Sequence, residues 1–191
     1  MIFHHIGFLV FPRLTLLDLI GPYDALRRVR TMGVDPALRW TFYGTVLDPV
    51  DDSGTRVHVD QLLPPPPLGG IDLLVVPGGF GVDDLRGSRA VREHLAAWPA
   101  ERPIASVCSG SLLLGDAGLL RGRRATTHHG RREQLRPLCA EVVTGERVVD
   151  TGNVITAAGV TSGIDLGLHL VARFWGGDAR ARIAAQMEWS G

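Results

Sequence analysis

Cys108 is the residue whose sequence surroundings most clearly predict chemistry. It stands in the segment Ser106-Val107-Cys108-Ser109-Gly110, between an apolar run and a small-residue turn that opens onto more apolar sequence. A buried strand, a turn of small residues and a following helix are typical of a nucleophile elbow. Helix N-terminal amides at an elbow lower a cysteine pKa from about 8.5 to roughly 3.5–7.5. We therefore expect a reactive thiol here, and the alternative is a buried structural cysteine.

Asp18 lies in the segment LTLLDLIGPYDAL, where it is surrounded by apolar residues close to the end of the first expected strand. One interpretation is a capping box formed by Thr15 and Asp18, with aspartate in place of the usual glutamate. The other is that Asp18 reaches the carboxyl edge of the sheet and meets Cys108. An ionised carboxylate there would raise the thiol pKa, and a shared proton would couple the two titrations.

A glycine-rich turn, VVPGGFG, occupies residues 75–81. A phosphate-binding loop is not expected, because the sequence has neither a G-x-G-x-x-G continuation nor a lysine. An elbow nucleophile usually works beside two backbone N–H groups that stabilise developing negative charge. We expect Ser109 to supply one of these donors and Gly79 the other, unless the glycines only form a turn.

His128 is the histidine most relevant to this chemistry, because it follows Cys108 by 20 residues. That spacing is compatible with a cysteine–histidine dyad and equally with a structural role. The seven histidines form no H-E-x-x-H pattern, and the sequence has no C-x-x-C. We therefore expect no metal site.

The composition narrows the class of protein. All 20 basic residues are arginine, which excludes Schiff-base lysine chemistry. The formal net charge is zero, so we expect no partnership with nucleic acid and none with an anionic membrane surface. With 191 residues, 45 % of them apolar, the chain is expected to form a single domain over residues 1–191.

The two cysteines are too few for a disulfide framework and fit a reducing compartment. Cys139 lacks the surroundings of an elbow, and we expect it to be unreactive. Residues 1–11 carry no basic leader and are interpreted as a strand, not a signal peptide. Residues 155–175 contain Asp165 and Arg173, so a membrane span is not expected and the predicted location is the cytoplasm.

Apolar runs alternate with helical patterns along the chain, which predicts an α/β domain with a mostly parallel sheet. The expected strands are 6–11, 39–44, 55–60, 71–76 and 103–107, with short strands between 141 and 157. The expected helices are 15–31 (interrupted near Gly21-Pro22), 88–98, 109–117, 131–139, 160–175 and 178–187. The proline-rich segment 63–70 is expected to be a loop.

Four segments together resemble the isocyanide (isonitrile) hydratases of the PfpI-type branch of the class I glutamine amidotransferase-like superfamily. They are FPRLTLLDLIGPYDAL, DLLVVPGGFGV, PIASVCSGSLLLGDAGLLRGRRATTHH and RVVDTGNVITAAGVTSGIDLGLHLV. The resemblance covers nearly the whole chain. It implies a three-layer αβα, flavodoxin-like fold, commonly a homodimer, and cofactor-free addition of water to an isocyanide, which gives an N-substituted formamide.

In the roles that the resemblance implies, Cys108 attacks the isocyanide carbon and Asp18 is the general acid/base beside it. Ser109 stands where those hydratases have threonine, which is a conservative difference. His129 stands where the family often has tryptophan, a difference that would change the shape of the pocket. His128 matches a family histidine that the hydratase mechanism does not clearly need.

Other functions are compatible with the same motifs. Similar domains form the N-terminal half of AraC-type transcription regulators and bind ligands there; the absence of a helix-turn-helix segment before Gly191 favours an enzyme. Peptidase or amidase, deglycase and glyoxalase activities also occur in the superfamily. Those proteins tend to have glutamate where Asp18 stands. The side chain of aspartate is one methylene shorter, which moves the acidic proton by about an ångström, enough to matter at a reacting centre. Low-pKa cysteines also oxidise readily, which keeps redox sensing as an alternative.

Overall fold

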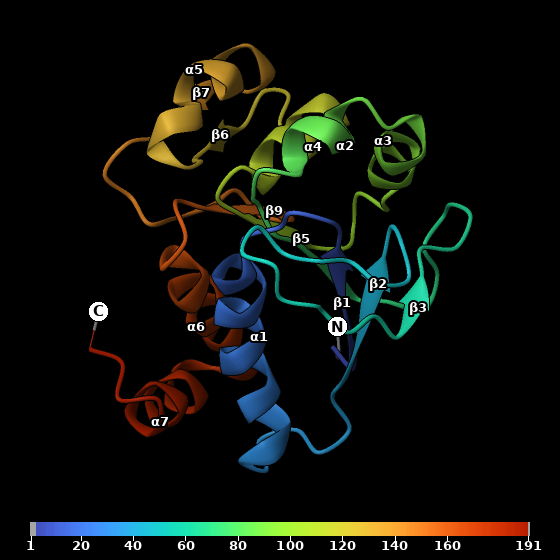
Figure 1. Ribbon diagram of the computed structural model, residues 1–191. Coiled ribbons are helices and arrows are strands. Elements are labelled where there is room, and N and C mark those ends of the chain that lie inside the picture. Colours follow the sequence, from blue (N-terminus) through green and yellow to red (C-terminus); the bar gives the residue numbers. More distant parts are fainter. Residues whose placement is uncertain (1–2, 191) are drawn as a thin grey trace.

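The computed structural model describes residues 3–190, and its core is a seven-stranded sheet in the order β3-β2-β1-β4-β5-β9-β8 (Figure 1). Neighbouring strands are parallel except for β8 and β9, which are antiparallel. A separate pair, β6 and β7, is parallel. The strands are β1 (His5–Val10), β2 (Arg39–Gly44), β3 (Gln61–Leu62), β4 (Leu73–Val76), β5 (Ile104–Val107), β6 (Arg124–Ala125), β7 (Glu141–Val142), β8 (Val148–Asp150) and β9 (Val154–Ala157).

Helices cover both faces of the sheet. α1, α6 and α7 lie on one face, and α2, α3 and α4 lie on the other (Figure 1). The α-helices are α1 (Leu16–Thr31), α2 (Val82–Arg86), α3 (Arg89–Ala96), α4 (Gly110–Asp116), α5 (Arg132–Leu135), α6 (Ser162–Trp175) and α7 (Gly177–Gln186), with the 3-10 helices η1 (His129–Arg131) and η2 (Arg136–Leu138). This three-layer arrangement confirms the predicted α/β fold with a mostly parallel sheet.

The central strands have no solvent-exposed face. Every residue of β4, β5 and β9 is buried, as are the last five residues of β1. Strands that are covered by helices on both sides are continuously apolar instead of alternating, which is why these runs were recognisable in the sequence. Within residues 3–190, no helix combines the length and the apolar character that crossing a membrane requires.

The structure corrects three details of the predicted elements. Residues 55–60 form no strand; they contribute one isolated bridge, between Val50 and Arg56, and the sheet gains only the short β3 afterwards. Val57 N–H donates to Pro49 O at 3.0 Å, so this segment pairs with a nearby loop. The expected helix 131–139 divides into α5 and η2, because Pro137 has no N–H to continue an α-helix.

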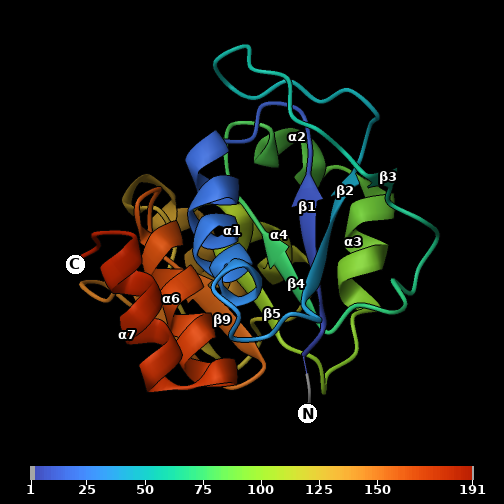
Figure 2. The ribbon, with the colours of Figure 1, turned by 90° about the horizontal axis from the view of Figure 1, so that it is seen from below.

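The third correction concerns α1, which continues through Gly21 and Pro22 without interruption. Packing against α6 explains this continuity (Figure 2). A Cβ on Gly21 would lie 3.1 Å from Ile164 N, and a Cβ on Gly163 would lie 3.0 Å from Pro22 Cδ. The two helices therefore touch at their backbones, and this contact outweighs the poor helix propensity of glycine and proline.

Gly167 offers a direct test of this close helix packing. A Cβ at Gly167 would lie 2.7 Å from Ala25 Cβ and 2.9 Å from Pro22 O, so we expect Gly167→Ala to lower the free energy of unfolding by about 1–3 kcal/mol. Gly177→Ala is the matched control, because no atom lies within 4 Å of its added Cβ. Urea denaturation of both variants checks this; equal stabilities would contradict the proposed close contact.

Candidate active site

Cys108 occupies the sharp turn between β5 and α4. Its φ is 57°, a left-handed value that is uncommon for a residue with a side chain. Its N–H donates to Ala157 O and Ala158 O at 3.1 and 2.8 Å, and its C=O accepts from the Ser111 and Thr127 hydroxyls at 3.2 and 2.9 Å. These hydrogen bonds hold the strained backbone in place, as expected for a nucleophile elbow.

Glycines allow the loop after β4 to approach this turn closely. A Cβ on Gly110 would lie 2.4 Å from Val76 O, and one on Gly78 would lie 2.6 Å from Ser109 N and 2.8 Å from Asp18 Oδ2. Small residues are therefore required at the elbow because the neighbouring strand's loop presses against the start of α4. The same approach brings the β4 loop against Asp18.

Asp18 is completely buried in the first turn of α1. Its Oδ2 accepts a hydrogen bond from Gly78 N–H at 3.1 Å, while Oδ1 is buried without a partner of good geometry in the described chain. Thr15 makes no side-chain cap; its hydroxyl donates to Asp52 Oδ2 at 2.8 Å instead. The capping-box interpretation is therefore wrong, and Asp18 points toward the carboxyl edge of the sheet.

Asp18 and Cys108 influence each other strongly. Burial raises the pKa of Asp18 to about 7, and the adjacent Cys108 thiol and the Gly78 amide lower that pKa to a lesser extent. Burial and, to a lesser extent, the charge of Asp18 together raise the pKa of Cys108 to about 12. At neutral pH the pair therefore keeps at least one proton, which resides mainly on sulfur when the carboxyl is ionised.

This result overturns the low thiol pKa expected from the elbow alone. The backbone amides of Ser109 and Val160 do act on the sulfur and lower its pKa, as the elbow geometry predicts. However, the Cys108 residue is only 7 % exposed, so its thiolate loses most of its hydration. Desolvation and the nearby carboxylate outweigh the favourable amides.

Of the two expected backbone donors, only Ser109 faces the sulfur. Gly79 N–H donates to Ser109 Oγ at 3.0 Å, and this hydroxyl donates back to Gly79 O at 3.2 Å, so the Gly79 amide is occupied in this conformation. Val160, which follows β9, was not identified in the sequence. Its position could have been inferred, because β9 pairs with β5 and their carboxyl ends meet at one edge of the sheet.

A cavity of about 360 Å³ opens at Cys108. Its walls come from the loops that follow β1, β4, β5 and β9 and from the segment 128–131: Thr15, Gly79, Phe80, Cys108, Ser109, His128, Gly130, Arg131 and Val160. Asp18 is not part of the wall and lies behind the sulfur. A small molecule in this cavity can contact the sulfur, while the carboxyl is closed to bulk solvent.

His128 lines the same cavity, but the described structure shows no hydrogen bond between it and Cys108. Its Nδ1 accepts from Gly130 N–H at 3.2 Å, and its ring packs on His129 with centroids 4.2 Å apart. Burial lowers the pKa of His128, as do the charges of His129, Arg131 and Arg132. His128 is therefore neutral at pH 7 and shapes the cavity wall.

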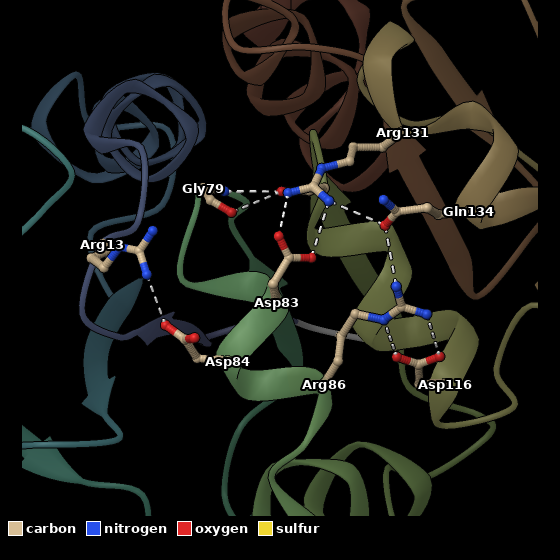
Figure 3. Close-up of polar contacts among 9 residues, drawn as sticks. Arg13, Gly79, Asp83, Asp84, Arg86, Asp116, Arg131 and Gln134 are labelled. Atoms are coloured by element: carbon tan, nitrogen blue, oxygen red, sulfur yellow. Dashed lines mark hydrogen bonds and ion pairs between the residues drawn. The ribbon is translucent and has the colours of Figure 1, made fainter.

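A network of ion pairs fixes the wall formed by residues 128–135 (Figure 3). Arg131 donates two hydrogen bonds to Asp83, at 3.0 and 2.6 Å. Gln134 accepts from Arg131 and from Arg86, and Arg86 also binds Asp116 through two nitrogens. α2, α4 and α5 are thereby joined around the cavity.

Among residues 3–190, no group of histidine, cysteine and acidic side chains is arranged to hold a metal ion. Cys139 is a free cysteine whose Sγ donates to Leu135 O at 3.5 Å. It is partly buried, and burial raises its pKa. Nothing near Cys139 resembles the surroundings of Cys108.

The raised pKa of Asp18 predicts a characteristic pH dependence of stability. An unfolded aspartate titrates near 3.9, so between about pH 4 and 7 the native state binds a proton that the unfolded state lacks, and stability falls as pH rises. Asp18→Asn removes this penalty. Between pH 5 and pH 8, the free energy of unfolding of the variant should rise by on the order of 2 kcal/mol relative to that of the wild type. Urea titrations at both pH values measure this difference. Parallel pH profiles would contradict the assigned pKa.

The thiol pKa is tested by alkylation with iodoacetamide in a Cys139→Ala background. We expect the rate at Cys108 to keep rising from pH 7 to 10 without a plateau, because the thiolate is a minor species throughout. Removing the negative charge in Asp18→Asn should accelerate alkylation at pH 8 by about tenfold for each unit by which the thiol pKa falls. A plateau below pH 8 in the Cys139→Ala protein would refute the raised pKa.

Comparisons with known proteins agree with this architecture. The chain is 37 % identical over 187 residues to the isonitrile hydratase of Pseudomonas putida, covering 97 % of this chain and 78 % of that protein. It is 31 % identical over 186 residues to the HTH-type transcriptional regulator CdhR of Pseudomonas aeruginosa, covering 94 % of this chain and 53 % of the regulator.

A crystal structure of a THiJ/PfpI family protein from Pseudomonas syringae superposes with a TM-score of 0.85 at 31 % identity, covering 100 % of this chain and 77 % of that one. The model of the DJ-1/PfpI family matches residues 4–173. The sequence resemblance to PfpI-type proteins is thus confirmed, and the chain belongs to the DJ-1/PfpI family.

Proposed function

We propose that this protein adds water to isocyanides to form N-substituted formamides without a cofactor, with Cys108 as nucleophile and Asp18 as proton carrier. The observation that carries the proposal is the buried Cys108–Asp18 pair at the end of a cavity. The 37 % identity with an isonitrile hydratase supports the same chemistry.

The first half of the reaction forms a carbon–sulfur bond. The Asp18 carboxylate takes the thiol proton while the sulfur attacks the terminal carbon of the isocyanide, and Asp18 then gives this proton to that carbon. The product is a thioimidate, R–N=CH–S–Cys108. The amides of Ser109 and Val160 stabilise the sulfur while it carries negative charge.

Water completes the reaction in the second half. Asp18 removes a proton from water as the oxygen adds to the thioimidate carbon, and the nitrogen receives that proton. The resulting tetrahedral intermediate expels the sulfur as its hydroxyl proton passes to the sulfur through Asp18. One N-substituted formamide leaves, and both residues return to their starting protonation states.

A raised carboxyl pKa suits this role. An acid/base group is most efficient when its pKa is close to the working pH, and the pKa of Asp18 is raised to about 7. Asp18 can therefore accept and return a proton at similar cost. We assign His128 no step, because the described residues show no hydrogen bond between it and the Cys108 sulfur.

The proposal also includes a homodimer in the cytoplasm. Leu17 and Ile20 on α1 are each 37 % exposed and offer apolar surface for a second copy. Two free cysteines fit a reducing compartment.

A ligand-sensing domain is the second candidate, supported by the 31 % identity with the regulator CdhR. In that case, the cavity at Cys108 would bind a small molecule without converting it. The same geometry would then serve recognition, and substitutions at Asp18 would change affinity instead of rate.

Turnover of cyclohexyl isocyanide tests the enzyme proposal. We expect the purified protein to form N-cyclohexylformamide, detected by chromatography. Cys108→Ala should abolish product, because the cavity wall contains no other thiol. Asp18→Asn should lower kcat/KM by at least about 100-fold. Cys139→Ala is the control and should retain full turnover.

Product formation by the Cys108→Ala protein would refute the proposed mechanism. If the wild type forms no formamide yet cyclohexyl isocyanide raises its Tm, the sensor proposal gains support instead. Methylglyoxal is the comparison substrate: conversion of methylglyoxal without hydration of the isocyanide would favour a glyoxalase-type activity.

A further inference from the structure

A second cavity, of about 350 Å³, lies next to the one at Cys108. The two share His128 and Val160 in their walls. Val160 is also the residue whose amide acts on the sulfur of Cys108. A ligand that reaches from the sulfur past these two residues would therefore enter the second cavity.

Three charged side chains line the second cavity, and two of them are already neutralised. Arg147 donates to Asp165 at 2.6 Å and to the Thr161 hydroxyl at 3.0 Å. Glu146 accepts from Arg124 at 3.1 Å. Neither group needs a ligand to complete its interactions.

Arg132 is the third, and it differs from the other two. In the described part of the chain it has no ion pair, and its Nε is buried without any hydrogen-bond acceptor. Its chain neighbours do not help, because Arg131 binds Asp83 and Glu133 binds Arg136. Nε is closed to solvent, so a ligand in the cavity would meet the terminal Nη atoms, which are not buried and have no acceptor among the described residues.

We infer that the second cavity is a carboxylate subsite, in which Arg132 binds an acidic group carried by the substrate. This inference rests on the proposed function and specifies its substrate class as isocyanides with a carboxylate tail. A guanidinium matches a carboxylate with two parallel hydrogen bonds. A single unpaired guanidinium supplies one positive charge, which favours a monoanion over a dianionic phosphate.

The experiment compares ω-isocyano carboxylates of two, four and six carbons with their methyl esters. We expect at least one acid to be preferred over its ester, and Arg132→Gln to reduce the acid-to-ester ratio of kcat/KM about 10- to 100-fold. Arg136→Gln is the matched control, because Arg136 is an exposed arginine of the same segment that pairs with Glu133. Its ratio should stay at the wild-type value.

A binding measurement separates this inference from the hydratase proposal. Hydration of an ω-isocyano carboxylate gives an N-formyl-ω-amino acid. Isothermal titration of the Cys108→Ala protein with this product should show binding, and adding Arg132→Gln should weaken that binding about 10- to 100-fold. If no isocyanide is hydrated but this binding holds, the subsite stands and the hydratase proposal fails. The subsite would be overturned by turnover that shows no Arg132-dependent preference for acids. It would also be overturned if inorganic phosphate bound at Arg132 more tightly than the N-formyl product.

Discussion

Two acidic groups, the Asp18 carboxyl and the Cys108 thiol, lie side by side in a site that is largely shielded from water. Two negative charges in such surroundings are costly, because little solvent is present to screen them. Burial raises the pKa of each group, and the charge of Asp18 raises that of Cys108 further, so the pair resists losing its last proton. This shared proton is what the rest of the site is arranged to hold and move. In the proposed reaction, this proton is delivered to the carbon that the sulfur attacks.

Strand order explains how residues far apart in the sequence meet at this pair. β1, β4, β5 and β9 are consecutive neighbours in the sheet, and their carboxyl ends share one edge. The segments that follow them supply Asp18, Gly78, Cys108 and Val160 in turn. Backbone contact at glycines brings these loops close enough to interact. The core of buried strands keeps that edge rigid, and the ion pairs of Arg131 and Arg86 hold the remaining wall in place.

The sequence was sufficient to predict most of this arrangement. Apolar runs identified the buried strands, and the small residues around Cys108 identified the elbow. The direction of the thiol pKa shift was not predictable from the elbow alone, because it depends on burial and on Asp18, which lies 90 residues away in the chain. Whether the Gly79 amide is free or occupied depends on the rotamer of Ser109. The local sequence does not determine this rotamer. Segment 55–60 alternates like a strand, yet it hydrogen-bonds to a loop that no local pattern identifies.

Infrared difference spectroscopy tests the central claim most directly, because it detects the two protons themselves. Spectra of the wild type minus Asp18→Asn isolate the C=O band of a protonated carboxyl, and spectra of the wild type minus Cys108→Ala isolate the S–H band. We expect the carboxyl band at pH 5 and its loss near pH 7, with the S–H band still present at pH 8. An ionised Asp18 at pH 5, or a Cys108 thiolate at pH 7, would contradict the account.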